Sequence, residues 1–343
     1  MAPMPKTDHE IEALLSRPTP GATEAVKHLP GDFVVLGVGG KMGTTTAVML
    51  RRALDEAGRK EARVLGVSRF SRPEARQELE SFGVQTLSCD LADAAQVAKL
   101  PLVPNVLYLA GQKFGTSSAP EATWIQNTVV PSLVAQHYRN SRIVVFSTGC
   151  VYPFASVEGR GSNEDEELAF LGEYASTCVG RERVFSYYSK VHQTPQLMYR
   201  LNYAVELRYG VLVDIAQRVV AGEPVDATMG WFNCIWQGDA CARAIQCLGH
   251  TASPASRLNI TGPEKLSIRE VAHDFGRRFG REARVVGQEA PTAWLADASR
   301  SIALFGPPSV SVDQMMDLIV DHLSAGGRLL GKPTHFEARS GKF

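Results

Sequence analysis

Hydrophobic and polar positions follow two alternating patterns along most of the chain. Short runs of neighbouring apolar positions, rich in Val, Leu and Ile, are separated by longer stretches with the spacing of helices. Runs of the first kind are typical of strands that are covered on both faces, as in a parallel sheet. The six runs occupy residues 33–38, 62–68, 84–89, 105–111, 142–148 and 196–203. Their alternation with helical patterns predicts an α/β fold with a doubly wound parallel sheet.

The pattern changes at both ends of this region. Residues 1–30 contain two short helical patterns, at 8–16 and 22–28, and are interpreted as a helical extension appended to the main body. After residue 205, Gly, Pro and Trp interrupt the chain before helical patterns resume at 239–248, 267–279 and 312–323. Residues 206–343 are therefore predicted to form mainly a smaller mixed substrate-binding lobe, with some segments returning to the main body.

A cluster of glycines follows the first strand run. The sequence "GVGGKMG" places Gly37, Gly40 and Gly43 at GxxGxxG spacing, and a helical pattern begins there. In this context the glycines permit a tight turn, close approach of a pyrophosphate and close packing of the helix on the sheet. Amides at the start of the helix can bind phosphate oxygens. The motif therefore predicts a dinucleotide site more strongly than a simple turn. Two further residues of the turn are expected at that site, Lys41 and Met42.

The ends of the second and third strand runs bear on the choice of coenzyme. The second run ends at Ser68 and Arg69, with no acidic residue to hold a free ribose 2′-hydroxyl. An arginine there would pair with a 2′-phosphate, so NADP is preferred to NAD unless Arg69 is only a solvated surface charge. The third run is followed by Asp90 and Leu91, which are predicted to reach the adenine. Asp90 could equally cap the helix that follows it.

Composition and charge favour a small-molecule partner. The 36 basic and 36 acidic side chains cancel, so no overall field attracts nucleic acid or an anionic membrane. The six cysteines include no CxxC pair and are interpreted as reduced thiols, and no metal site is predicted. The first residues lack the apolar stretch of a signal peptide, and no run is long enough to span a membrane. A cytoplasmic location is therefore expected.

Further motifs follow the glycine turn in a recognisable order. They are "YLAG" at 108–111, an asparagine at 127 and "STGCVY" at 147–152. With the glycine turn, they make residues 31–310 resemble the extended short-chain dehydrogenase/reductases, the NAD-dependent epimerase/dehydratases. The resemblance implies a Rossmann dinucleotide-binding domain over residues 31–205 and a homodimer formed through the helices at 122–138 and 170–188. It also places three residues of the fourth strand beside NAD(P): Leu109, Ala110 and Gly111.

The same resemblance implies a catalytic pair. Thr148 would bind the substrate hydroxyl, and Tyr174, 26 residues later, would contact the coenzyme and act as general base. Glu182 fits the glutamate expected eight residues after the tyrosine, but Cys178 occupies the position of the expected lysine. A lysine there would favour the tyrosinate form. The phenol of a tyrosine has a pKa of ~10, and this pKa must fall by about three units for the residue to act as a base near pH 7. Cys178 is interpreted as a small buried residue filling this space, with a reactive thiol as the alternative. Arg181 lies about 10 Å from the tyrosine by helix rise, which makes direct replacement of the lysine doubtful.

Residues expected near the substrate depart from the family pattern. The segment "FNCIWQGD" lacks the arginine that contacts the diphosphate of nucleotide sugars, and Asn202 is displaced by one position. A polyol, sugar acid or ketone is therefore at least as well supported as a nucleotide diphosphate-sugar. Gln112, Lys113 and Phe114 follow the fourth strand and are predicted to lie toward the nicotinamide. Lys113 would replace the missing lysine or anchor an anionic substrate, unless it is an exposed loop lysine.

Two functions from different classes remain open at this point. The first is an NAD(P)-dependent oxidoreductase, epimerase or dehydratase for a hydroxyl-bearing, sugar-like substrate. In it, Tyr174 exchanges the hydroxyl proton and Thr148 hydrogen-bonds the oxygen. The second is a coenzyme-binding sensor that has lost turnover, which Cys178 favours and the retained Thr148 and Tyr174 oppose.

Overall fold

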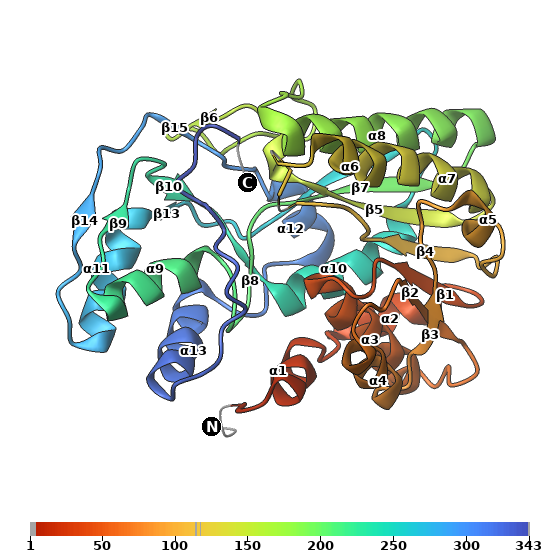
Figure 1. Ribbon diagram of the computed structural model, residues 1–343, viewed down its shortest axis with the longest axis horizontal. Helices are drawn as coiled ribbons and strands as arrows, with labels where there is room; N and C mark the ends of the chain where they lie inside the picture. The colour runs from red at the N-terminus through yellow and green to blue at the C-terminus, as the bar shows by residue number, and fades with distance from the viewer. Residues whose placement is uncertain (1–4, 114, 117, 342–343) are drawn as a thin grey trace.

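A parallel sheet of seven strands forms the centre of the computed structural model, which describes residues 5–113, 115–116 and 118–341 (Figure 1). Its strand order is β12-β7-β5-β4-β1-β2-β3. The strands are β1 (Phe33–Leu36), β2 (Val64–Ser68), β3 (Gln85–Ser88), β4 (Asn105–Tyr108), β5 (Arg142–Thr148), β7 (Gln196–Leu201) and β12 (Ser256–Ile260). The chain goes from β1 to one edge of the sheet and then returns to add strands on the other side. This reversal between β1 and β4 is the place where ligands bind in open α/β sheets.

Helices cover both faces of the sheet, as the continuous apolar runs predict. Along β1, Phe33 and Val35 pack into one core, whereas Val34 and Leu36 pack into another, because successive strand residues point to opposite faces. The first core is shared with α2 (Pro20–Lys27), α3 (Lys41–Glu56) and α10 (Gln237–Cys247). The second is shared with α7 (Val130–His137) and α8 (Gly172–His192). The predicted doubly wound α/β fold is thus confirmed.

The N-terminal helices are integral to the structure. Helix α1 (Asp8–Leu15) begins with a capping box at Thr7, and its Ile11 and Leu15 are buried in the core of the C-terminal lobe. Val26 of α2 is buried in the core beneath the sheet. The two helices form close to where the sequence predicts them. Each contributes buried apolar side chains to a core, so the predicted N-terminal extension packs against both the sheet domain and the C-terminal lobe.

The C-terminal lobe packs three helices around its own apolar core. These are α9 (Val211–Ala221), α11 (Ile268–Phe279) and α13 (Val312–Ser324). Four short strand pairs connect the lobe to itself and to the sheet domain: β9 (Val225–Asp226) with β14 (Val285–Val286), β10 (Trp231–Phe232) with β13 (Leu266–Ser267), β8 (Ala204–Val205) with β11 (Ile235–Trp236), and β6 (Ala155–Ser156) with β15 (Thr292–Ala293). After α13 the tail runs back past β8 toward β6 and β15 (Figure 1).

The remaining elements are short. They are α4 (Pro73–Ser81), α5 (Ala94–Val97), α6 (Pro120–Trp124), the π-helical turn η1 (Ile125–Val129), the 3₁₀ turns η2 (Gly149–Val151) and η3 (Leu248–His250), and α12 (Ser299–Phe305). Strand β12 is the one sheet strand that the apolar runs do not predict, because its first two residues, Ser256 and Arg257, are polar. Within the described ranges no helix has both the length and the apolar character needed to cross a bilayer.

Candidate active site

The glycine turn brings the ends of β1 and β4 into close contact. Gly37 has φ of +88°, and a Cβ added to it would lie 2.6 Å from the backbone nitrogen of Ala110. Glycine is the residue that tolerates both the left-handed backbone and this approach. A Cβ on Gly43 would lie 2.5 Å from the carbonyl oxygen of Gly37, so Gly43 lets α3 begin directly against the turn. Gly40 is the N-cap of α3 and has no side chain to block the amides behind it.

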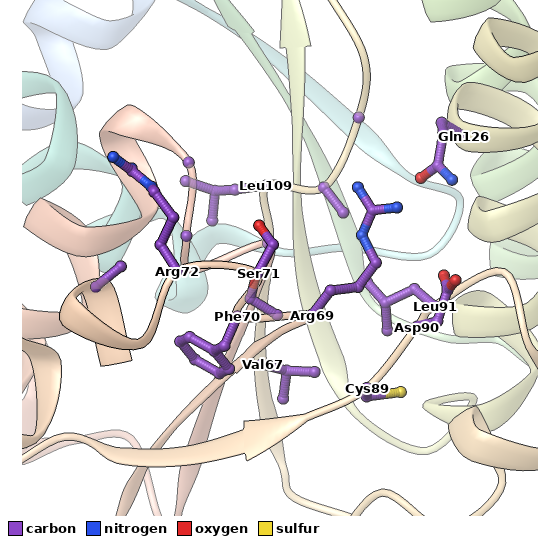
Figure 2. A pocket seen from close by; sticks show the side chains of 17 residues that line it. Val67, Arg69, Phe70, Ser71, Arg72, Cys89, Asp90, Leu91, Leu109 and Gln126 are labelled. Carbon is purple, nitrogen blue, oxygen red and sulfur yellow. The ribbon is translucent and has the colours of Figure 1, made fainter. Parts of the chain in front are cut away.

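A cavity of about 300 Å³ opens beside this turn, and we call it the glycine-turn cavity (Figure 2). It lies where the carboxyl ends of β1, β2, β3 and β4 meet. Nine of the residues expected at the coenzyme line it: Gly37, Gly40, Ser68, Arg69, Asp90, Leu91, Leu109, Ala110 and Gly111. Gly43 does not line it, because its contribution is the packing of α3.

The loop after β2 adds a second cation that the sequence analysis did not single out. Arg72 lines the glycine-turn cavity together with Arg69, and both side chains are exposed. In Figure 2 the two arginine side chains extend away from each other from this loop. Gln126, on the opposite wall, was also missed, because it comes from η1 rather than from a strand end.

Asp90 lies at the wall of the cavity but does not cap the following helix. The N-cap of α5 is Asp93, whose carboxylate accepts hydrogen bonds from the amides of Ala95 at 2.8 Å and Gln96 at 3.2 Å. The Asp90 carboxylate instead accepts one from the amide of Ala92 at 3.0 Å. The capping alternative for Asp90 is therefore wrong, because the residue that caps α5 lies three positions further along the chain.

A second cavity, of about 170 Å³, contains the expected catalytic pair, and we call it the tyrosine cavity. Six of the predicted residues line it: Lys41, Met42, Lys113, Thr148, Tyr174 and Asn202. Gln112 lines neither cavity, and Phe114 lies outside the described residues. The lining also includes residues that were not predicted, among them Cys150, Tyr203, Tyr209 and Thr334.

Burial dominates the acid–base properties of Tyr174. Loss of hydration raises the pKa of its phenol well above the ordinary value, and the nearby Cys178 and Cys150 thiols act in the same direction. The Arg181 charge and a hydrogen bond with the Thr148 side chain lower it. The structure thus places Thr148 and Tyr174 in contact, with Tyr174 protonated in the absence of a further positive charge.

Cys178 is fully buried beside the tyrosine. Burial raises the pKa of its thiol to about 11, although the Arg181 charge opposes the shift. Since the thiolate is the reactive form, a thiol with this pKa is a poor nucleophile at neutral pH. The geometry therefore favours the interpretation of Cys178 as a residue that fills space.

Arg181 extends between the sheet and η1. Its Nη1 donates to the carbonyl oxygen of Phe146 at 2.9 Å and its Nη2 to Asn127 Oδ1 at 2.5 Å. A Cβ on Gly111 would lie 2.3 Å from that Nη2, so the guanidinium lies against the end of β4. The Asn127 side chain also accepts a hydrogen bond from the backbone amide of Gln112 and donates one to its carbonyl oxygen, each at 2.9 Å. Through this contact Asn127 fixes the loop that carries Lys113.

A buried ion pair supports the floor of the tyrosine cavity. Arg200 and Glu182 are both almost completely buried and are joined by two hydrogen bonds, the shorter of 2.7 Å. Ser147, directly before Thr148, donates to the same Glu182 carboxylate at 2.6 Å. Asn202 donates to Asn233 Oδ1 at 2.7 Å and to the Trp294 carbonyl oxygen at 3.2 Å, and so joins the cavity to the C-terminal lobe.

Comparison with known proteins identifies the family. A model of the NAD dependent epimerase/dehydratase family matches residues 33–204. The chain belongs to the NAD dependent epimerase/dehydratase family. This confirms the resemblance found in the sequence, and the matched segment contains the glycine turn, Thr148 and Tyr174. The protein is therefore an enzyme of the epimerase/dehydratase type.

Solved structures share the fold of this family member at low sequence identity. UDP-glucose 4-epimerase of Thermus thermophilus, in complex with NAD, is 18% identical, with a TM-score of 0.68 over 85% of this chain and 99% of that chain. An epimerase of Methanothermobacter thermautotrophicus is 16% identical, with a TM-score of 0.71 over 90% and 97%. A dTDP-glucose 4,6-dehydratase mutant of Streptomyces venezuelae with NAD bound is 17% identical, with a TM-score of 0.68 over 84% and 95%. A comparison with curated proteins found no match.

Proposed function

We propose that this protein binds a nicotinamide coenzyme in the glycine-turn cavity and acts on a hydroxyl-bearing, sugar-like substrate in the tyrosine cavity. The main support for this proposal is that the two cavities meet at the glycine turn. Gly40 lines the first, and the next two residues, Lys41 and Met42, line the second. A coenzyme with its phosphates at the turn would therefore have its reactive end close to Thr148 and Tyr174.

The residues present fit such a coenzyme. The close approaches at Gly37 and Gly43 keep side chains out of the turn, and α3 directs its first amides there. Residues of the glycine-turn cavity would hold the dinucleotide, and Tyr174 would contact its nicotinamide half. When bound, the coenzyme supplies or accepts the hydride. Leu109, Ala110 and Gly111 would form the wall beside it.

The protein's own groups would handle the proton and the oxygen. In the direction of oxidation, the Tyr174 phenolate takes the proton of the substrate hydroxyl, and in the direction of reduction the phenol returns it. The Thr148 hydroxyl hydrogen-bonds the same substrate oxygen and favours its charged form. Asn202 would help to position the substrate from the other wall, and Gln112 would hold the adjoining loop through Asn127.

The proposal is tested by measuring turnover of all four oxidised and reduced coenzymes with a panel of polyols, sugar acids and nucleotide sugars. Saturable, substrate-dependent change in reduced coenzyme is the expected result. The second candidate, a sensor without turnover, is favoured by the neutral Cys178 thiol and the raised pKa of Tyr174. Coenzyme binding without hydride transfer, and no gain on Cys178→Lys, would support the sensor and overturn the enzyme.

We further propose a preference for NADP over NAD. Ser68 and Arg69 line the glycine-turn cavity at the end of β2, and Arg72 lines it from the same loop. A guanidinium pairs well with a phosphate, whereas the ribose 2′-hydroxyl of NAD would find no carboxylate from Ser68 or Arg69.

Replacing Arg69 with alanine tests this preference. We expect the affinity for NADP⁺ to fall about 10- to 100-fold, the usual loss for a charge-assisted hydrogen bond, while that for NAD⁺ changes less than about threefold. Titration by fluorescence or calorimetry provides the measurement. Arg277→Ala removes an exposed charge from α11 and serves as the control. Equal losses for both coenzymes, or none, would exclude a 2′-phosphate contact at Arg69.

A homodimer is proposed through the helices that cover one side of the sheet. Exposed apolar side chains gather on α6, η1, α8 and the residues just before α8: Trp124, Ile125, Val129, Phe170, Tyr187 and Val191. Contacts between α6, η1 and α8 bring much of this surface together. Light scattering is expected to give twice the 37.3 kDa of one chain, and a charged residue at Ile125 is expected to lower that mass. A monomer at micromolar concentration would contradict the proposal.

The extension (1–30), Rossmann domain (31–205) and substrate-binding lobe (206–343) are retained as a proposed division of labour. The Rossmann domain would bind the coenzyme, the lobe would close over the substrate, and the N-terminal helices would pack against both. The lining of the tyrosine cavity supports this division, since Tyr209, Gly210 and Thr334 belong to the third part.

A further inference from the structure

The lining of the tyrosine cavity has an unbalanced charge. Among the described residues that form it, two are lysines, Lys41 and Lys113, and none is acidic. The other polar groups are neutral hydroxyls and an amide, from residues such as Thr148, Tyr203 and Asn202. A ligand in this cavity therefore meets a positive wall.

The two lysines come from different parts of the chain, Lys41 from the first turn of α3 and Lys113 from the loop after β4, and converge on one aromatic ring. Lys41 Nζ lies 4.0 Å from the centre of the Tyr209 ring and donates to the carbonyl oxygen of Ala204 at 3.3 Å. Lys113 Nζ donates to the Tyr209 hydroxyl at 3.4 Å. Both ammonium groups are thus held at the same end of the cavity, one over the ring face and one at its hydroxyl.

The local electrostatics disfavour the charged form of Lys41. Burial lowers the pKa of Lys41 to about 8, and the neighbouring Lys113 acts in the same direction. Glu206 raises it, but that carboxylate already accepts hydrogen bonds from the amide of Arg208 at 2.9 Å and from its Nε. Glu206 is fully buried and does not line the cavity. An anion between the lysines would relieve their repulsion.

The size of the cavity limits what that anion can be. The cavity holds about 170 Å³, below the 300–1,000 Å³ that is usual for sites of drug-sized ligands. Thr334 of the C-terminal tail forms part of its wall, and its backbone nitrogen and hydroxyl donate to Asp214 at 2.7 and 2.6 Å. Phe336 anchors the tail in the core of the lobe. The tail therefore narrows the tyrosine cavity at Thr334.

We propose that the tyrosine cavity binds a small hydroxy acid, with the substrate carboxylate held by Lys41 and Lys113 and a hydroxyl presented to Thr148 and Tyr174. This assignment of substrate class rests on the proposed function of the same site. A carboxylate offers each ammonium group an oxygen and occupies less space than a phosphate or a nucleotide diphosphate. In this arrangement Lys41 and Lys113 are specificity-determining residues, and Tyr209 positions both of them.

The test is the direct binding of four- to six-carbon sugar acids and their matching alditols to the full chain, measured by calorimetry with and without saturating coenzyme. At least one acid is expected to bind about tenfold or more tightly than its alditol. Lys41→Met and Lys113→Met are each expected to lower acid affinity about 10- to 100-fold and alditol affinity less than about threefold. Lys41→Arg should recover part of the loss, and Lys99→Met, at an exposed site outside both cavities, should change neither.

Three outcomes would overturn the assignment. If no acid binds better than its alditol, the lysines do not select a carboxylate. Tighter binding of the matching sugar phosphate would make phosphate the recognised group. A fall in coenzyme affinity as large as that in acid affinity would place Lys41 at the dinucleotide instead. Binding does not require turnover, so acid selectivity without hydride transfer would refute the proposed function and leave this inference standing.

Discussion

Replacing Tyr174 with phenylalanine is expected to lower kcat by about 10²- to 10⁴-fold, with coenzyme affinity changed by less than about threefold. The substitution removes only the hydroxyl that exchanges a proton with the substrate. It leaves the ring in the wall of the tyrosine cavity beside Thr148. Single-turnover measurement of hydride transfer, together with coenzyme titration, separates the two effects.

The pH dependence of the wild-type enzyme should agree with this role. Burial raises the pKa of Tyr174 above its ordinary value, so the phenolate that acts as base is scarce at neutral pH. Oxidation should therefore accelerate with rising pH, whereas reduction, which needs the protonated phenol, should not. The Arg181 charge lowers this pKa and should extend the active range toward lower pH.

Tyr188 offers a matched control on the same helix. Its hydroxyl pairs with that of Ser132 at 3.1 Å and lies outside both cavities. Tyr188→Phe is expected to keep the wild-type rate and pH profile. Retained turnover in Tyr174→Phe, or an equal loss in both variants, would show that the Tyr174 phenol does not carry the proton.

Replacing Gly37 with alanine is expected to destabilise the fold by about 2–5 kcal/mol and to remove most coenzyme binding. The left-handed backbone accounts for about 1–2 kcal/mol of this loss. The collision of the new Cβ with the backbone of Ala110, at 2.6 and 2.7 Å, adds about 1–3 kcal/mol. Because that collision pushes β1 and the end of β4 apart, it also deforms the wall of the glycine-turn cavity. Chemical unfolding and coenzyme titration below the unfolding transition measure the two losses.

Gly58 separates the backbone effect from the collision. Its φ is +75°, similar to that of Gly37, but an added Cβ would meet nothing within 4 Å. Gly58→Ala should therefore cost only the backbone part, about 1–2 kcal/mol, and leave coenzyme affinity unchanged. The account of the turn fails if the two variants lose equal stability, or if Gly37→Ala binds coenzyme as the wild type does.

The sequence predicts the sheet and the glycine-turn cavity well for a common reason. Buried parallel strands appear as apolar runs, and ligands bind where such strands end, so Ser68 and Asp90 follow directly from position. Gly111 follows from the family resemblance of its motif. The sequence does not predict strand β12, because its first half is polar. Only its pairing with β7 in the structure identifies these residues as a strand.

The lining of the tyrosine cavity is harder to predict from the sequence than that of the glycine-turn cavity, because more of it is set by tertiary contacts. Tyr209 and Thr334 reach it only because the C-terminal lobe and tail fold back, and Asp214 fixes the path of the tail. For Arg181, helix rise alone overstates the distance between the guanidinium and Tyr174. Side chains on a helix lean toward its N-terminus, so the long Arg181 side chain reaches across part of the backbone separation of about 10 Å. The structure places this group against Gly111, where its charge acts on Tyr174.

Titration calorimetry of the wild-type chain with NAD⁺, NADH, NADP⁺ and NADPH shows directly whether the glycine-turn cavity binds a coenzyme. We expect saturable binding at one site per chain, mutual competition among the coenzymes, and tighter binding of the phosphorylated pair. The absence of heat and of competition up to millimolar concentration would contradict this expectation, because the glycine-turn cavity would then hold no nicotinamide dinucleotide.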